Sequence, residues 1–255
     1  MTRFRGVLVL IAALLLVHEV QAQRENPLSR DEVAVIKKKL VNVLEALGQP
    51  AGGYAIEHEN FNLPTEAYKN TESSLFQPVS ASADRTYGTQ KQAEKQNEDL
   101  SKEYQKKFAE AQAKGDYQAM AKLSQEMQKK SGEAQLKAVE GKKEPVTVTV
   151  NLNYSAGATI DPDAVLFERS GVIALKTKDQ SSTDKERVYI YFDPVLLKDT
   201  KQLSRVDLRS PEKGVAKRIT VLHVTIELYG PAGEIEPLAK KVDVSKVLAQ
   251  IDAAK

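Results

Sequence analysis

The chain has 255 residues, with 37 Lys and Arg against 35 Asp and Glu, and a formal net charge of +2. This balance gives no electrostatic reason to expect a nucleic acid partner, because proteins that bind nucleic acid concentrate positive charge on one surface. Cysteine is absent, which excludes disulfides, thiolate nucleophiles, cysteine-bound metals and lipid attachment at a cysteine.

The N-terminal residues have the layout of a secretory signal peptide. A start containing two arginines precedes an apolar run over 6–17, and small residues up to Ala22 predict cleavage between Ala22 and Gln23. The run is shorter than the roughly 20 apolar residues that a membrane-spanning helix needs. We therefore expect 1–22 to be removed and 23–255 to form a single domain in the periplasm or outside the cell. Retention of the run as an anchor is the alternative, and no second stretch predicts a membrane span.

The first expected helix begins at a capping box, in which Ser29 is followed three residues later by Glu32. The apolar residues after it are spaced for one helical face: Val33, Ile36, Leu40, Val43 and Leu47. Gly48 then ends the helix, and 54–63 form a candidate strand. Residues 65–89 are rich in Ser, Thr and Ala with few large apolar side chains, which predicts a loosely ordered connection.

The composition changes over residues 90–141, where strong helix formers fill almost every position and proline is absent. Gly115 and Asp116 interrupt this run. Glycine suits the end of one helix and aspartate suits the N-cap of the next. We therefore predict an antiparallel helical hairpin, inserted into the domain, with Gly115 and Asp116 at its turn.

The apolar residues of this segment mirror each other about the expected turn. Residues at equal distances before and after the turn face each other in an antiparallel pair, and most of these pairs are apolar. The expected seam, listed outward from the turn, is Ala111 with Met120, Phe108 with Leu123, and Tyr104 with Met127. Leu100 faces Ser131 in one weaker layer. A narrow apolar seam with polar residues on the other faces is typical of a two-stranded coiled coil.

From residue 145 onward, alternating apolar and polar residues are typical of strands. The expected strands are 146–154, 164–167, 171–177, 188–192, 219–229 and a final one near 238–244, followed by a terminal helix over 245–254. Short turns between successive strands favour antiparallel pairing. The predicted fold class is therefore α+β, with an antiparallel β-sheet of about five to six strands, helices at both ends of the domain, and the inserted coiled-coil hairpin.

The sequence predicts no catalytic site, no metal site and no cofactor. It lacks a Gly-x-Ser-x-Gly elbow, a phosphate loop and a dinucleotide fingerprint. His58 stands between two glutamates, but neighbours on a strand point to opposite faces, so these three residues cannot share one ligand site. His223, within the expected strand 219–229, is interpreted as a partly exposed sheet residue. Asp161 and Asp193, each followed by proline, are interpreted as turn residues.

These observations favour an exported, non-enzymatic binding or structural protein, in which the hairpin contacts a protein partner or a second copy of the chain. The alternative is a periplasmic or extracellular carrier of a small molecule or lipid, with Tyr189, Tyr191 and Tyr229 lining a pocket. Nothing in the spacing of dispersed carboxylates, such as Glu57 and Asp161, favours a hydrolase. The sequence leaves open whether the hairpin protrudes or packs on the sheet.

Overall fold

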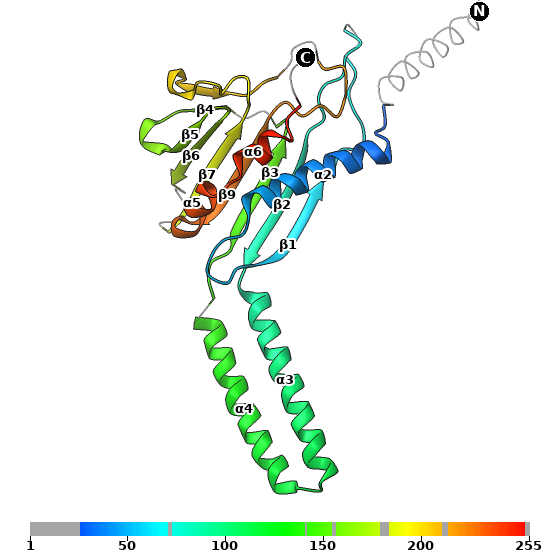
Figure 1. Cartoon of the computed structure of the whole chain (residues 1–255), viewed down its shortest axis with the longest axis vertical. Coiled ribbons are helices and arrows are strands. Elements are labelled where there is room, and N and C mark those ends of the chain that lie inside the picture. The colour runs from blue at the N-terminus through cyan, green and yellow to red at the C-terminus, as the bar shows by residue number, and fades with distance from the viewer. Residues whose placement is uncertain are drawn as a thin grey trace, which may run out of the picture.

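Figure 1 shows the computed structural model of the chain, in which helices cover one side of a sheet and a long pair of helices extends from the end of that sheet. The structure describes residues 26–70, 73–140, 142–154, 157–178, 184–210 and 214–252. The predicted signal peptide, 1–22, and its cleavage site at Ala22 and Gln23 lie outside these ranges.

Within the described residues the fold is α+β, with a seven-stranded antiparallel sheet, a separate two-stranded sheet and five α-helices. The helices are α2 (Arg30–Leu47), α3 (Gln90–Ala113), α4 (Tyr117–Glu140), α5 (Ala232–Lys240) and α6 (Val244–Leu248). The strands are β1 (Ala55–Asn62), β2 (Ala81–Gly88), β3 (Val146–Leu152), β4 (Gly157–Thr159), β5 (Val165–Arg169), β6 (Val172–Lys178), β7 (Lys185–Phe192), β8 (Arg205–Asp207) and β9 (Val224–Pro231). The order across the large sheet is β1-β2-β3-β9-β7-β6-β5, while β4 pairs with β8.

The alternation of residues along β3 shows where the core lies. Val148 and Val150 are buried on the face that α2, α5 and α6 cover, and Thr147 and Thr149 lie on the opposite face. The same covered face receives the apolar residues of the helices, including Leu40 of α2. Burial of these side chains supplies most of the stabilisation, at roughly 25 cal/mol per Å² of apolar surface.

The capping box predicted at the start of α2 is confirmed. The Ser29 amide donates to Glu32 Oε2 at 2.8 Å, and the Glu32 amide donates to Ser29 Oγ at 3.2 Å. At the other end, the amide of Gly48 donates to the Glu45 carbonyl, and its positive φ of 75° suits glycine. Local sequence therefore defines both ends of this helix.

The prediction of a loosely ordered connection over 65–89 is wrong for its last part, which forms β2. This strand pairs with β1 on one side and β3 on the other. Its core-facing residues include Ala81 and Ala83, which are buried near α2. Small side chains suffice at these two positions because a helix packs above them. Tyr87 is the one large buried aromatic residue of the strand, which has no Val, Ile, Leu or Phe to mark it in the sequence. The extra strand brings the sheet to seven.

Two expectations near the C-terminus are also wrong. Residues 238–244 do not form a strand, because Ile235, Leu238 and Ala239 follow helical spacing and bury one face of α5 against β7 and β9. The expected strand 219–229 begins only at Val224.

Asn153 explains the late start of β9. Its side-chain amide donates to the carbonyls of Val79 and Thr220, and its side-chain oxygen accepts from the Leu222 amide. These bonds hold the residues before Val224 in a loop, because they use backbone groups that a strand ladder would otherwise pair.

The two long helices α3 and α4 join β2 to β3. They pack against each other and extend away from the sheet, and the main contact of α3 with the body is with β1. At their base the Lys143 amide donates to Thr89 Oγ1 at 3.3 Å. We call this pair of helices, with its turn at 114–116, the arm. Across the described residues, no helix is both long enough and apolar enough to cross a bilayer.

Candidate functional site

Gly115 and Asp116 lie between the end of α3 and the start of α4. Gly115 has a φ of +65°, a left-handed conformation that costs glycine little and other residues more. Asp116 Oδ1 accepts from the Ala119 amide at 2.9 Å, so this carboxylate caps α4. The chain therefore reverses direction between α3 and α4, and the Asp116 side chain satisfies one of the amides at the start of α4.

All six residues of the expected seam are buried or half-buried. Tyr104 and Ala111 are buried, and Phe108, Met120, Leu123 and Met127 are half-buried. Neighbours that fall outside the apolar spacing, such as Gln105 and Gln112, are exposed. Because α3 packs on α4, each helix covers the apolar stripe of the other.

Ion pairs lie on the outer surface of the arm. The ion pairs at helical i,i+4 spacing are Glu98–Lys102, Glu103–Lys107 and Glu126–Lys130. Lys107 Nζ and Lys130 Nζ lie 5.2 and 5.7 Å from the ring centroid of Tyr104. The Tyr104 hydroxyl, followed by Lys130, lowers the pKa of Glu126. Such exposed pairs add little stability, but they give the arm a surface of mixed charge.

One aromatic side chain stands apart from this surface. Tyr117 opens α4 beside the turn and is 81% exposed, the largest exposed fraction among the large apolar side chains that the structure describes. Tyrosine contributes a rigid apolar body and a polar tip, which is why it is frequent at protein interfaces. Tyr117 does not follow the apolar spacing of the seam, so that spacing did not identify it as a functional residue. Its position next to the predicted turn is the feature of the sequence that could have done so.

The body offers a second candidate, on the sheet face opposite α2, α5 and α6, which we call the open face. Strand register places its residues in rows. One row runs Asp84, Thr149, Glu227, Tyr189 and Leu175 across five strands. The next row runs Asn151, Thr225, Tyr191 and Ile173. The open face is thus mainly polar and aromatic, in contrast to the apolar covered face.

A groove of about 730 Å³ lies on the open face, where β4 and the loop after it rise beside the sheet. A small apolar cluster that includes Leu175, Tyr191 and Val206 fills the space between this face and the β4–β8 sheet. The residues that line the groove are Asn151, Tyr154, Gly157, Ala158, Thr159, Asp161, Ala164, Leu175, Lys176, Thr177, Tyr189, Tyr191, Thr225 and Glu227.

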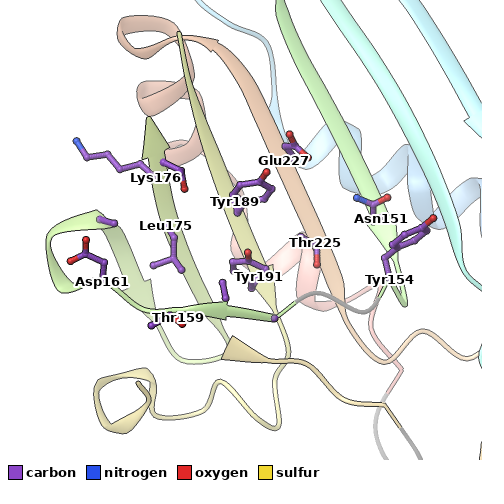
Figure 2. A pocket seen from close by; sticks show the side chains of 14 residues that line it. Asn151, Tyr154, Thr159, Asp161, Leu175, Lys176, Tyr189, Tyr191, Thr225 and Glu227 are labelled. Carbon is purple, nitrogen blue, oxygen red and sulfur yellow. The ribbon is translucent and has the colours of Figure 1, made fainter. Parts of the chain in front are cut away.

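Two tyrosines of β7 form the floor of the groove (Figure 2). The rings of Tyr189 and Tyr191 are nearly parallel, with centroids 6.3 Å apart and an interplanar angle of 21°. Burial raises the pKa of Tyr191 to about 12, with further contributions from Tyr189 and Glu227. Burial, followed by the charge of Glu227, also raises the pKa of Tyr189. Both hydroxyls are therefore neutral hydrogen-bond donors at physiological pH.

The charged residues beside the tyrosines neutralise each other. Arg187 forms an ion pair with Glu227 on the adjacent strand, and its guanidinium lies 4.6 Å from the ring centroid of Tyr229. Of the three tyrosines that the sequence analysis assigned to a possible pocket, two line the groove and one does not. Tyr189 and Tyr191 line the groove, while Tyr229 belongs to the open face without being one of the lining residues.

Thr225 has a buried hydroxyl that the chain leaves unsatisfied. The residue is 5% exposed, and its Oγ1 has no hydrogen-bond partner within the described part of the structure. It lines the groove between Tyr191 and Asn151, its partners in strand register. Leaving a buried polar group unpaired costs about 1–3 kcal/mol, so this position invites a partner from outside the chain.

His223 is buried at 3% exposure, so its interpretation as a partly exposed residue is wrong. Its Nε2 lies 3.0 Å from the Tyr154 carbonyl oxygen, and burial lowers its pKa. Asp193 is fully buried and accepts the backbone amides of three residues, which agrees with a turn role. Asp161 likewise accepts the Asp163 amide at 3.0 Å.

The structure does not bring the dispersed carboxylates together. Asp161 lies at the groove, Asp193 is enclosed after β7, and Glu57 lies on β1 at the far edge of the sheet. Among the described residues, no group of three or more His, Asp or Glu could hold a metal ion. Comparisons of the chain with protein-family models, with curated proteins and with solved structures gave no match.

Proposed function

We propose that the protein is an exported, non-enzymatic binding protein whose arm makes contact with another protein. One observation carries this proposal: β2 and β3 are directly paired neighbours, with Tyr87 opposite Val146, and yet the whole arm lies between them. Two such strands need only a two-residue turn to be joined. The arm is thus dispensable for the sheet, which supports a role outside the body. The signal peptide expected over 1–22 supports export.

The arm suits presentation of a contact surface at a distance from the body. We interpret it as an antiparallel coiled coil, because its apolar residues form one narrow seam between two helices of 24 residues each. Each helix is about 36 Å long at 1.5 Å per residue. A stiff arm of this length places the turn, and Tyr117 beside it, well away from the sheet.

A separate protein fits the arm better than a second copy of the arm does. The large apolar side chains exposed on it, among those that the structure describes, are Tyr117 at the tip and Leu136 towards the base. These two positions do not make the continuous apolar stripe that pairing of two arms would bury. A single exposed tyrosine suits insertion into a pocket of a partner, with the mixed charges forming a polar rim.

A photocrosslinking experiment in the source cells tests this proposal. A benzoyl-phenylalanine replaces Tyr117 in one variant and Tyr68 in another, since Tyr68 is also exposed, at 63%, but lies on the body. We expect one protein species to be crosslinked from position 117 and not from position 68. Adducts that are the same from both positions, or adducts of the chain with itself alone, would count against a separate partner.

The crosslinked species, once purified, allows a quantitative test. Tyr117→Ala should weaken its binding about 30-fold, the effect of losing roughly 2 kcal/mol at an interface hot spot. Replacing 88–145 by a two-residue Asn-Gly turn should abolish binding while the body stays folded, as judged by its near-ultraviolet circular dichroism. Equal binding by the arm-less variant would overturn the proposed role of the arm.

The groove on the open face supports a second function for the body, the binding of a small ligand. Its lining combines the two tyrosines with hydroxyl, amide and carboxylate groups. This function does not depend on the arm, and the chemistry of its ligand is argued next.

A further inference from the structure

We propose that the groove on the open face binds a neutral carbohydrate, a short segment of hydroxyl-rich sugar rings. The proposal rests on three observations about the groove: its aromatic floor, its unsatisfied hydroxyl, and the absence of an unpaired positive charge from its lining. It is independent of the function proposed for the arm, because no residue of α3 or α4 lines the groove.

The floor offers an apolar surface of the right shape for sugar rings. Tyr189 and Tyr191 are two residues apart on β7, so both side chains stand on the same side of the sheet. Their rings are near-parallel, with centroids 6.3 Å apart. Tyr191 is 4% exposed and supports the floor from below, while Tyr189 is half-buried and offers its ring to a ligand. A pyranose ring has C–H groups on its faces and hydroxyls around its edge. It can therefore pack a face against tyrosine while its hydroxyls remain directed to polar groups.

The polar groups around the floor supply the complementary hydrogen bonds. Thr225 Oγ1 is buried and without a partner among the described residues. A ligand hydroxyl could therefore form a hydrogen bond with it without breaking an existing one. Asn151 presents an amide with both donor and acceptor atoms. The Glu227 carboxylate lies beside Tyr189 in the same register row and can accept from a hydroxyl.

The charges at the groove disfavour anionic ligands. Glu227 is paired with Arg187, and Lys176, the cation of the lining, is paired with Glu236, so the lining offers no unpaired positive charge to hold an anion. Asp161 adds a carboxylate to the lining and repels anions such as phosphorylated or acidic compounds. A lipid chain would leave the buried hydroxyl of Thr225 without a partner and would cover the amide of Asn151, and burying unpaired polar groups costs free energy. A neutral ligand rich in hydroxyls is the class that meets all these conditions.

The size and position of the groove agree with a short oligosaccharide. Its volume of about 730 Å³ lies within the range of roughly 300–1,000 Å³ that is usual for small-ligand sites. The groove lies on a face of the sheet, over its inner strands, whereas a peptide that adds a strand needs a free edge. The edges of this sheet are β1 and β5, and neither has a residue in the lining.

A binding screen with the processed chain, 23–255, tests the proposal. The probes are neutral oligosaccharides, acidic oligosaccharides and unstructured peptides on one array, followed by calorimetric titration with the best binder. We expect binding of a neutral oligosaccharide at micromolar to millimolar dissociation constants. Binding of only acidic sugars, binding of only peptides, or no binding would each overturn the proposal.

Two matched pairs of variants locate the site. Thr225→Val removes the hydroxyl at nearly constant shape and should weaken binding about tenfold. Thr147→Val makes the same change on the open face outside the lining, and should alter binding less than twofold. Tyr189→Ala should abolish measurable binding, while Tyr229→Ala should not, provided that both variants keep the wild-type far-ultraviolet circular dichroism. Equal effects of the two threonine variants would show that the sugar binds elsewhere.

Discussion

Arg218 and Glu32 form a two-pronged ion pair that ties the start of α2 to the loop before β9. Nε and Nη2 of Arg218 each lie 2.7 Å from a carboxylate oxygen of Glu32, and Nη1 donates to the Pro27 carbonyl at 3.0 Å. The same carboxylate closes the capping box by accepting the Ser29 amide. One side chain therefore couples a local helix cap to a contact between segments that are distant in the sequence.

This pair should make part of the stability depend on acid pH. Hydrogen bonds from Arg218, and next from the Ser29 amide, lower the pKa of Glu32 to about 2. Because the folded pKa lies below the unfolded value of about 4.3, the stabilisation is complete above pH 4.3 and is lost as pH falls through 2. Glu32→Gln should lower the free energy of unfolding at pH 7 by about 1 kcal/mol, since solvent screens a partly exposed pair.

Urea unfolding at pH 7 and at pH 2.5 measures this effect. The difference between wild type and Glu32→Gln should be smaller at the lower pH. Asp31→Asn is the control, because Asp31 is an exposed acid in the same helical turn. An equal loss of stability in both variants would contradict the specific role of the ion pair.

His223 should add a second pH dependence, nearer to neutrality. Burial lowers its pKa below the usual value, partly offset by the Tyr154 carbonyl and the charge of Asp193. The folded state therefore favours the neutral imidazole, and the unfolded chain takes up the proton first. Stability should be complete above pH 6.5 and should decrease as pH falls below it.

The measurement is the thermal midpoint between pH 7.5 and 5 for three proteins. His223→Gln keeps a donor for the Tyr154 carbonyl but cannot titrate, so its midpoint should vary less with pH than that of the wild type. His58→Gln changes an exposed histidine on β1 and should retain the wild-type slope. A wild-type slope in His223→Gln would show that other groups carry the dependence.

The same glycine-to-alanine change should have opposite effects at two positions of the arm. Gly115 has a φ of +65° and an added Cβ there would meet nothing within 4 Å, so Gly115→Ala should cost about 1–2 kcal/mol through backbone conformation alone. Gly132 lies inside α4, also with open space around it. Gly132→Ala should stabilise the arm by about 0.5–1 kcal/mol. Amide hydrogen exchange of α3 and α4 reports both changes, and shifts of the same sign would disprove the turn geometry.

The two tyrosines of the arm should differ in what they stabilise. Tyr104 is fully buried between the helices, whereas Tyr117 is 81% exposed. Tyr104→Ala should destabilise the arm by about 3 kcal/mol, as truncation of a buried aromatic side chain usually does. Tyr117→Ala should change stability by less than about 0.5 kcal/mol. Helix content followed at 222 nm during heating distinguishes them, and similar melting of both variants would argue against the seam.

Much of the local structure could be predicted because its causes lie within a few residues. Ser29 and Glu32 satisfy each other across one helical turn, and Gly115 with Asp116 supplies the backbone conformation and the cap that a helix reversal needs. The alternation along β3 reports one buried and one polar face. The composition of β2 did not predict a strand, because its alanines are suited to a strand only where α2 packs on them. The residues of α5 follow helical spacing, but part of this segment was predicted to be a strand.

The groove could not be predicted because it is made by strand order. In the sequence, Thr225 and Glu227 alternate with apolar residues, and two tyrosines stand two positions apart. Nothing in the sequence indicates that β7 and β9 are neighbours in the sheet. Pairing of Tyr191 with Thr225 and of Tyr189 with Glu227 joins residues that are distant along the chain. Only this pairing turns scattered polar residues into one lining.

By itself, therefore, the sequence determined the helix caps, the strand faces, the turn of the arm and its pattern of apolar residues. All of these depend on short-range backbone geometry and on the periods of helix and strand. The tertiary structure alone decided that the arm stands between two paired strands, that His223 is buried, and that Thr225 faces a groove without a partner. These features depend on which strands lie side by side, and that is settled by the packing of the whole core.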